Sequence, residues 1–320
     1  MSRAALLTEC GRPPQLTDRA APVPGDGRVG IIVAAAPITP LDVLCASGTS
    51  YFGVPATPYV PGVQGVGHRA DGTPVWFATS AGMRPGDGSM AETVAVPDED
   101  VVALPAGVPL NDVAALGLSA VAAHSALTRS GGLAEGEQVV VLGAGGVVGQ
   151  AAVQLALLGG ARRVIAVARA AEARERALRY GAAAAVPLLP DDDPATLAAR
   201  IRDAADGPVH LVIDPVFGIP AAAALRALGA GGRLVHLGSA AAPTAPIESA
   251  ALRSGSISII GYTNNALTVA QRAESIRLVA AHALAGRLTV DHEPAPFESV
   301  ADAWARQSAG TAPRRIVLTL

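Results

Sequence analysis

The chain has 320 residues, half of them apolar and 16% charged, with a formal net charge of −3. That length can bury a large core and favours two domains, and the charge gives no electrostatic case for binding nucleic acid or an anionic membrane. Two cysteines, Cys10 and Cys45, do not make a disulfide framework and fit a reducing compartment. Because the N-terminus also lacks a secretory pattern, we expect a cytoplasmic protein.

Lysine is absent, so all 24 basic residues are arginine. The absence excludes pyridoxal phosphate chemistry, which needs a Schiff-base lysine. It also excludes the P-loop lysine and the Tyr-x-x-x-Lys pair of short-chain dehydrogenases. The charge-free stretch from Val139 to Ala161 is long enough for a membrane span, but its glycine cluster after a short β-branched run fits a buried strand, turn and helix better.

Residues 1–108 predict a compact, turn-rich β-barrel rather than a helical domain. Short apolar runs are separated by clusters of Gly, Pro and Asp, which favour turns. Pro105–Pro109 indicates a domain boundary, and Asn111–Asp112 can cap a helix that runs to about Arg129. The apolar runs are Val29–Ala34, Val75–Ala78 and Thr93–Val96.

From Gln138 onward, predicted strands and helices alternate, which is typical of an α/β fold with a doubly wound parallel sheet. A long helix from about Leu267 to Ala285, a shorter one near 299–307 and a closing strand at Arg315–Leu320 follow. The predicted strands are 139–143, 163–168, a short one within 183–188, 209–213, 233–237 and 256–260, and the predicted helices are 147–159, 171–180, 194–205 and 220–228.

The stretch from Gln138 to Gly160 predicts a buried strand, a glycine turn and a helix. Val139–Leu142 is continuously apolar, as in a strand covered on both faces. The glycines that follow have the spacing G-x-x-G-x-x-G rather than G-x-G-x-x-G, and such a turn lets a diphosphate approach the free N–H groups of the helix. The alternative is a tight turn that binds nothing. The expected dinucleotide contacts are Gly143, Gly146, Val147, Val148 and Gly149.

The end of the next predicted strand favours NADP(H) over NAD(H). An NAD site usually carries an acidic residue about twenty residues after the glycine turn, but that position is Arg169 and no acid occupies Val164–Ala171. A guanidinium pairs with a 2′-phosphate, which a carboxylate would repel. Arg169 is the first candidate and Arg174 the second, unless both are solvated arginines that open an exposed helix.

Seven motifs spread over the whole chain occur in the order of a known family. They are Pro40-x-Asp42 with Gly48 and Tyr51, PYVPGVQGVG at 58–67, DGSMAETVAVP at 87–97, AALGLSAVAAHSAL at 114–127, VVVLGAGGVVGQAAVQLA at 139–156, IDPVFG at 213–218 and GGRLVHLG at 231–238. With these motifs the chain resembles the medium-chain dehydrogenase/reductase superfamily, particularly its zinc-free quinone oxidoreductase branch.

The resemblance implies a GroES-like β-barrel catalytic domain over residues 1–108, completed by 264–320, and a Rossmann NADP(H)-binding domain over 109–263. It also implies a cofactor in the cleft between the domains. Members of the family commonly pair as homodimers through edge strands, here Ser256–Gly261.

The zinc ligands of related alcohol dehydrogenases are missing. Those enzymes carry Cys where this chain has Pro40, Gly-His-Glu where it has Gly62-Val63-Gln64, and a four-cysteine lobe that it lacks. Cys45 and His68 alone do not make a catalytic zinc set. We therefore expect no metal.

Without a strong Lewis acid, the resemblance favours acceptors that are already electron-poor, namely quinones and α,β-unsaturated carbonyls (enones). A hydrogen-bond donor would stabilise the enolate or hydroquinone oxygen that forms. The catalytic candidates are Tyr51 and Tyr59, which the resemblance places against the cleft, although both can instead be wall residues of the pocket. Asp42 matches a family position and can alternatively hold a loop through backbone amides.

Further cofactor contacts follow from position. Gly238 and Ser239 end a strand at the carboxyl edge of the sheet, where ligands bind in such folds. Asp214 can bond a cofactor hydroxyl or cap the following turn, and the cap is favoured. Asn264 can reach the nicotinamide or the substrate, and Arg315 replaces a basic residue that the family often carries before its last strand.

Two other interpretations stay open. A Rossmann methyltransferase normally has an acidic residue near the strand before its glycine loop, and none flanks Val139–Gly143. A non-catalytic NADP(H)-binding member of the same fold is compatible with the sequence, because zinc-free relatives have no indispensable side chain to look for.

Overall fold

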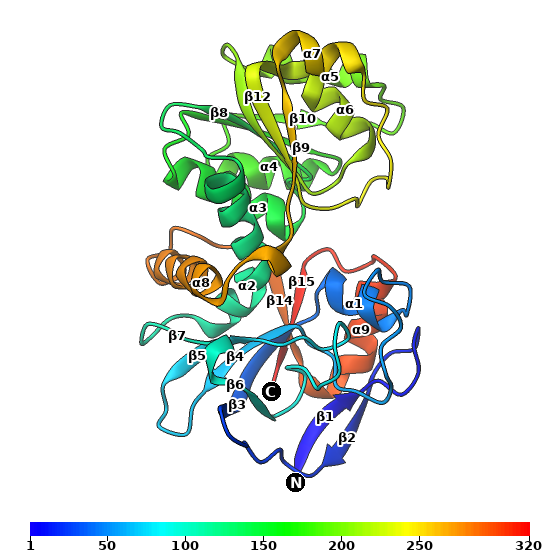
Figure 1. The fold of residues 1–320 in the computed structure, drawn as a ribbon, viewed down its shortest axis with the longest axis vertical. Helices are drawn as coiled ribbons and strands as arrows, with labels where there is room; N and C mark the ends of the chain where they lie inside the picture. Colours follow the sequence, from blue (N-terminus) through cyan, green and yellow to red (C-terminus); the bar gives the residue numbers. More distant parts are fainter. The chain divides into compact units, whose positions relative to one another are not determined.

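The computed structural model describes residues 1–320, which form two compact units (Figure 1). The first unit comprises Met1–Gly117 and Val269–Leu320, and the second comprises Leu118–Thr268. The blue to cyan and the orange to red segments of Figure 1 therefore build one unit, so that the two ends of the chain fold together.

A mixed sheet forms the body of the first unit. The strands of this unit are β1 Ser2–Leu6, β2 Gln15–Arg19, β3 Arg28–Pro37, β4 Gln64–His68, β5 Pro74–Ala78, β6 Thr93–Pro97, β7 Val101–Ala103, β14 His292–Pro296 and β15 Arg315–Thr319. They lie in the order β14-β15-β3-β4-β5-β7, with β6 paired to β3, and β1 and β2 form a separate pair. Only β14 and β15 run parallel.

The core of this unit follows from the period of two along β3. Ile31 and Val33 of β3 are buried, whereas Ile32 between them is 60% exposed. Strand β5 departs from this period, because the consecutive Trp76 and Phe77 are both completely buried and both faces of the sheet are therefore covered there. The β-rich character that the sequence predicts for the first third of the chain is confirmed.

Helix α1, Pro40–Ala46, is one element of this unit that the sequence pattern does not predict. Thr39 caps it in a reciprocal pair with Asp42, and a proline opens it. The helix is too short to show a 3.6-residue period, and its only sequence signal is this Thr-Pro-x-Asp cap. Helices α8, Val269–Leu284, and α9, Val300–Ser308, lie where the sequence predicts them.

The second unit is a parallel sheet with the doubly wound strand order. Its strands are β8 Gln138–Leu142, β9 Arg163–Ala168, β10 Ala184–Pro187, β11 Val209–Asp214, β12 Leu228–His236 and β13 Ser258–Gly261. They lie in the order β10-β9-β8-β11-β12-β13 and all run parallel. This order is that of a dinucleotide-binding sheet, so the predicted α/β class is confirmed.

Helices cover both faces of the parallel sheet. They are α3 Val147–Leu158, α4 Ala171–Arg179, α5 Pro194–Ala204, α6 Gly218–Ala227 and α7 Ser249–Gly255. Right-handed crossovers place α3 and α4 on one face and α5 and α6 on the other, and α5 packs directly on α6. Helix α7 is not predicted from the sequence because it buries no residue and so carries no apolar stripe.

The prediction of one continuous helix capped by Asn111–Asp112 is wrong. Helix α2, Leu110–Ser125, starts one residue earlier and breaks at Gly117 (φ 29°, ψ −131°), and a π-helix over Ala126–Ser130 follows. A Cβ at Gly117 would lie 2.0 Å from Oε1 of the buried Gln64, so only glycine fits. By length and composition Leu110–Ser130 qualifies as a membrane span, but 67% of its apolar window is buried within the protein.

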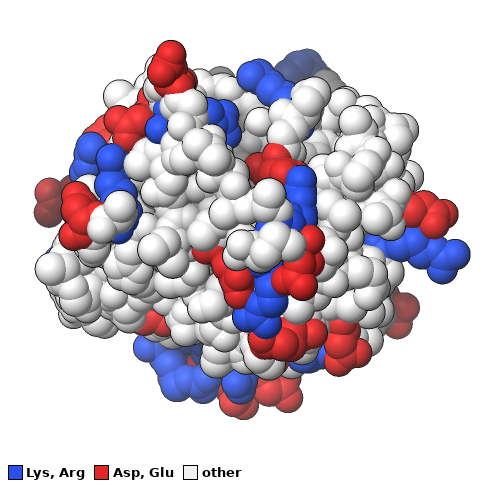
Figure 2. Space-filling view, turned by 90° about the horizontal axis from the view of Figure 1, so that it is seen from below, with Lys and Arg blue, Asp and Glu red and all other residues white.

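Charged side chains on the face of Figure 2 occur in small clusters that contain both signs. Within the first unit, several ion pairs join side chains of opposite sign, for example Arg3 with Glu92 and Glu298, and Arg69 with Asp98. Surface pairs of this kind contribute little to stability, because water and salt screen them.

Candidate functional site

The candidate site lies at the carboxyl edge of the parallel sheet, where β8 and β11 are neighbours. After β8 the chain continues through α3 to β9, and after β11 it continues through α6 to β12. Strands β9 and β12 lie on opposite sides of the β8–β11 pair, so the two connections run in opposite directions. A crevice opens where such connections diverge, and ligands of doubly wound sheets bind there. The turn after β8 is Gly143–Gly149, and the turn after β11 is Pro215–Gly218.

Two of the predicted glycines are required by packing. Gly143 has φ +62°, and a Cβ there would lie 2.6 Å from Cγ1 of Val216 in the neighbouring turn. A Cβ at Gly149 would lie 2.4 Å from the carbonyl oxygen of Gly143. Gly146 differs, because the nearest atom to its Cβ position is 3.7 Å away and the residue is exposed. Only Gly146 therefore has an open side for a ligand.

The helix behind this turn presents backbone donors. Gly146 is the N-cap of α3 and provides no side-chain cap, and the first helical bond is from the Gln150 N–H to the Gly146 carbonyl, at 2.9 Å. The N–H groups of Val147, Val148 and Gly149 consequently have no acceptor within the helix. Together with the positive end of the helix dipole they form an arrangement suited to an anion.

The two predicted phosphate-binding arginines differ in their surroundings. Arg169, directly after β9, is exposed and its guanidinium has no hydrogen-bond partner in the structure. Arg174 donates from Nη1 to the carbonyl of Ala168, at 3.3 Å, and to the carbonyl of Arg169. Arg174 thus holds the strand end that carries Arg169, while the Arg169 side chain is available to a ligand.

The turn after β11 is organised by Asp214, which is completely buried. Its Oδ1 accepts hydrogen bonds from the N–H groups of Val216 and Phe217, at 3.0 and 2.8 Å, and its Oδ2 lies 3.1 Å from Nδ1 of His236. Burial raises the pKa of Asp214, although these hydrogen bonds oppose the shift. The structure shows the turn cap that the sequence favours for this aspartate.

This Asp214 turn also connects the two glycine positions of the edge. Its Val216 fills the space beside Gly143, and the carbonyl oxygen of Pro215 would lie 3.1 Å from a Cβ at Gly238. Phe217 adopts φ +59°, and its ring packs against that of His236 in a tilted arrangement with centroids 4.4 Å apart. A positive φ is uncommon for a bulky residue. The sequence does not predict these contacts of the Asp214 turn, because no pattern signals contacts between two distant turns.

Ser239 and Asn264 have different environments at the same end of the unit. Ser239 is exposed directly after Gly238. Asn264 is half-buried and its side chain is engaged at both ends: Nδ2 donates to the Leu118 carbonyl at 3.1 Å, and Oδ1 accepts from the Tyr262 hydroxyl at 2.7 Å.

The two predicted catalytic tyrosines of the first unit lie in unlike places. Tyr51 is 80% exposed in the loop after α1, and its ring packs on Phe52 with centroids 4.2 Å apart. Tyr59 is 5% exposed within the apolar core, and burial raises its pKa. Its hydroxyl oxygen would lie 3.0 Å from a Cβ at Gly82, so this glycine gives it room.

Asp42 and Arg315 belong to the interior of the first unit. The Asp42 carboxylate accepts from the Thr39 N–H and the Val63 N–H, both at 2.8 Å, which is the loop-holding role considered from the sequence. Arg315 is 7% exposed and donates to the Ile38 carbonyl at 3.4 Å. Burial lowers the pKa of Arg315 to about 10, while the nearby charge of Asp42 acts in the opposite direction.

Metal ligands do not assemble anywhere in the structure. No three His, Cys, Asp or Glu side chains lie close enough together to hold an ion. Cys45 is buried, and burial raises the pKa of its thiol to about 11, which disfavours the thiolate that binds metals. The residues present therefore do not fit a zinc centre.

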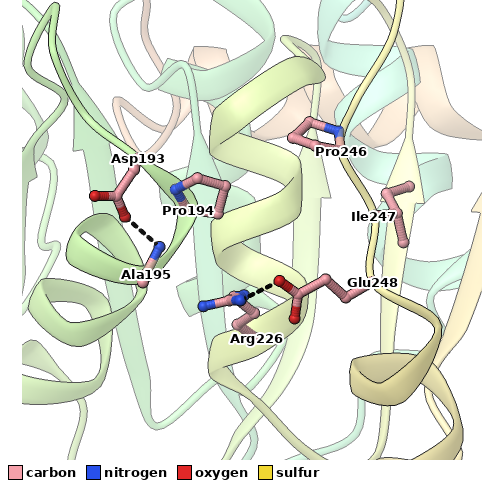
Figure 3. Close-up of a pocket in the computed structure, with 7 residues that line it drawn as sticks. All are labelled: Asp193, Pro194, Ala195, Arg226, Pro246, Ile247 and Glu248. Atoms are coloured by element: carbon pink, nitrogen blue, oxygen red, sulfur yellow. Dashed lines mark hydrogen bonds and ion pairs between the residues drawn. The ribbon is translucent and has the colours of Figure 1, made fainter.

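A hollow of about 470 Å³ lies on other elements of the second unit, lined by Asp193, Pro194, Ala195, Arg226, Pro246, Ile247 and Glu248. Figure 3 shows these residues. The charged groups of the hollow are already engaged. Asp193 caps α5 through the N–H groups of Ala195 and Thr196, and Arg226 pairs with Glu248. Because these charged groups already serve a helix cap and an ion pair, the glycine turn is the better candidate.

Comparison with known sequences identifies relatives. The family model described as zinc-binding dehydrogenase matches residues 147–281. Human quinone oxidoreductase is 32% identical over 195 residues, which cover 57% of this chain and 57% of the human protein, so the alignment spans little more than half of that relative. A component of the phenolphthiocerol/phthiocerol polyketide synthase of Mycobacterium tuberculosis is 29% identical over 93% of this chain and 14% of that component.

Comparison with solved structures extends the likeness to the whole chain. The quinone oxidoreductase of Thermus thermophilus, also determined in complex with NADPH, matches with a TM-score of 0.81 and 28% identity. The match covers 99% of this chain and 100% of that protein. Sequence and fold thus agree in their likeness to the medium-chain dehydrogenase/reductase superfamily, and they support its quinone oxidoreductase-like branch.

Proposed function

We propose that the protein is a cytoplasmic NADPH-dependent oxidoreductase that delivers a hydride to a quinone or an α,β-unsaturated carbonyl without zinc. The glycine turn at the switch point of the sheet carries this proposal. Its helix offers the N–H groups of Val147 and Val148 to an anion, and the exposed Arg169 follows the neighbouring strand.

Several groups support NADPH rather than NADH as the cofactor. Arg169 is exposed and has no internal partner, so its guanidinium can pair with a 2′-phosphate. The Arg174 guanidinium is occupied with backbone carbonyls, so we assign it the support of Arg169 instead of a direct contact. The relative from Thermus thermophilus was solved with NADPH.

When bound, the nicotinamide supplies the hydride, and the protein supplies binding and orientation. The N–H groups of Val147 and Val148, at the open side of Gly146, would hold the diphosphate, while Gly143 and Gly149 let the turn pack closely. Gly238 and Ser239 would contact the nicotinamide half. A contact from Asn264 would compete with its bonds to Leu118 and Tyr262. The burial of Arg315 beside Asp42 supports a role within the first unit, and its distant cofactor contact stays a prediction.

The acceptor class rests on the chemistry and on the relatives. Quinones and enones accept a hydride without a Lewis acid, and this chain assembles no metal ligands. The relatives are named quinone oxidoreductase and polyketide synthase. Tyr51, exposed and stacked on Phe52, is proposed as an aromatic wall or proton donor. The buried Tyr59 is the weaker candidate for proton donation, because burial disfavours its charged form.

The first test is a fluorescence titration of NADPH and NADH on the wild type, Arg169→Ala and the control Arg179→Ala, an exposed arginine of α4. We expect tighter binding of NADPH, and loss of that preference only in Arg169→Ala. NADPH oxidation with a panel of quinones and enones then tests catalysis. Binding of NADPH with no turnover of any acceptor would favour the non-catalytic alternative, and absence of binding would refute both.

We also propose a homodimer that forms through β13. This strand lies at the edge of the parallel sheet, so its outer N–H and C=O groups are unpaired, and Ile259 on it is 40% exposed. Light scattering after size-exclusion chromatography should give a dimer for the wild type and a monomer for Ile259→Glu. An unchanged mass would place the interface elsewhere.

A further inference from the structure

The carbonyl of Gly145, inside the glycine turn, is held by two side chains that do not belong to the glycine motif. Nε2 of Gln150 donates to it at 2.9 Å, and Nη2 of Arg176 donates to it at 3.2 Å. Gln150 lies in the first turn of α3 and is 4% exposed, whereas Arg176 comes from the following helix, α4, and is half-buried. We call this pair the Gly145 clamp.

The clamp fixes the orientation of a whole peptide unit. The Gly145 carbonyl and the Gly146 N–H belong to one planar group, so holding the oxygen also holds the nitrogen. The Gly146 N–H in turn donates to the Gly143 carbonyl at 3.1 Å. Glycine on both sides would otherwise let this peptide rotate at little cost.

The direction of this peptide matters electrostatically. A carbonyl oxygen carries partial negative charge, and turned towards the start of α3 it would repel an anion there. The clamp commits the oxygen to Gln150 and to a cation instead. The N–H groups of Val147 and Val148 remain as the polar groups of the open helix end.

Close packing brings Arg176 to this position. A Cβ at Gly145 would lie 3.1 Å from Cβ of Ala173, so α4 lies against the turn. Arg176 follows Ala173 by three residues and is on the same side of the helix. Its guanidinium brings a full positive charge to the turn, in a partly desolvated place where charges act more strongly than in water.

We propose that Gln150 and Arg176 are positioning residues for the diphosphate of a dinucleotide bound at the glycine turn. This inference rests on the proposed function and adds a residue role to it. Arg169 decides between NADPH and NADH through the 2′-phosphate, whereas the clamp acts on the diphosphate, which both cofactors share. Loss of the clamp should therefore weaken both cofactors by the same factor.

The test compares Arg176→Met, Arg176→Lys and the control Arg179→Met. Arg179 lies on the same helix and is exposed, with no hydrogen bond to the turn. Dissociation constants are measured for NADPH, for NADH, and by competition for 2′-AMP, which carries the adenine and 2′-phosphate but no diphosphate. The midpoint of thermal unfolding is recorded for each variant.

We expect Arg176→Met to weaken NADPH and NADH about tenfold each, as for the loss of one hydrogen bond to a charged group, with 2′-AMP unchanged. Arg176→Lys should restore part of the affinity. NADPH binding by Arg176→Met equal to that of Arg179→Met would overturn the proposal, as would an equal loss for 2′-AMP, which indicates a merely structural role. If Arg176→Met does not fold, Gln150→Met decides by the same measurements. A wild type that binds neither NADPH nor 2′-AMP refutes the proposed function itself.

Discussion

The two edges of the parallel sheet differ in how far their polar groups are hydrogen-bonded within the protein. At the amino edge, Arg233 of β12 is completely used: Nε donates to the Gly131 carbonyl, Nη1 to Glu137 and the His210 carbonyl, and Nη2 to Glu137 and the Gly132 carbonyl. Gln138 similarly donates to the Asp206 and Pro208 carbonyls and accepts from the Asp206 N–H. Both of these strong polar groups have internal partners.

At the carboxyl edge, groups of the same chemical kinds are left available. The N–H groups at the start of α3 have no helical acceptor, and the exposed guanidinium of Arg169 has no internal partner. The groups that are satisfied there, Asp214 and the Gly145 clamp, act by holding the backbone in place. The amino edge thus serves stability, whereas the carboxyl edge has available donors for the cofactor that we propose.

Among substitutions that test this difference between the edges, Arg233→Met should have the largest effect on stability. The substitution leaves Glu137 and three carbonyls without their donor, and breaking a buried charge pair costs about 3–5 kcal/mol. Since Arg233 and Glu137 are about one-sixth exposed (15% and 16%), we expect about 2–4 kcal/mol less unfolding free energy in urea, with unchanged NADPH affinity in the folded protein. A large loss of affinity would show that the edges are not separate in function.

The next effect separates two glycines of the same turn. Gly149→Ala places a Cβ against the Gly143 backbone and should lower the unfolding free energy by about 1–3 kcal/mol. Gly146→Ala has room and should cost less than about 1 kcal/mol, yet it should weaken NADPH strongly because its Cβ occupies the open side. Urea unfolding and NADPH titration of both variants check this, and equal stability losses would contradict it.

A smaller effect concerns pH. Burial raises the pKa of Asp214 above its unfolded value, so the folded state holds this proton more tightly. The stability that protonation provides is present below the unfolded pKa and is lost as pH rises through the folded pKa. The unfolding free energy is measured against pH for two proteins, His236→Gln and the double variant His236→Gln/Asp214→Asn. Above about pH 4 it should fall less steeply with pH in the double variant. Equal slopes in the two proteins would contradict this expectation.

The smallest effect is expected from Arg174→Ala. This side chain only holds the carbonyls of Ala168 and Arg169, so its loss should weaken NADPH about threefold, as for one net hydrogen bond. NADPH titrations of Arg174→Ala and Arg169→Ala, measured in parallel, test which substitution weakens binding more. A loss for Arg174→Ala as large as that for Arg169→Ala would mean that both contact the phosphate.

Much of the fold can be predicted from local pattern. Continuous apolar runs such as Val139–Leu142 mark buried parallel strands, and the glycine spacing marks the turn that follows. Two of the misses have local causes, and the third does not. Helix α1 is too short for a period, α7 has no buried face, and the break of α2 at Gly117 depends on Gln64 of another strand, which no pattern within the helix can show.

The candidate site could be predicted only in part. Sequence spacing selects Arg169 but cannot separate it from Arg174, because the occupation of Arg174 depends on how its side chain folds back on the strand end. Tyr51 and Tyr59 lie close together in the chain and look alike in the sequence, yet one is 80% exposed and the other 5%. Arg176 had no sequence signal at all, because its contact joins two separate elements.

The sequence alone was sufficient to predict the class of this protein: a β-rich unit, a doubly wound sheet, and a glycine turn followed by arginine in place of an acid. These properties depend on residue type and spacing along the chain. The tertiary structure alone decided which arginine stays free, which tyrosine is accessible, how the Asp214 turn packs on Gly143, and that Gln150 and Arg176 hold one carbonyl. Those properties depend on side-chain direction and on contacts between distant segments, which only close packing of the folded chain establishes.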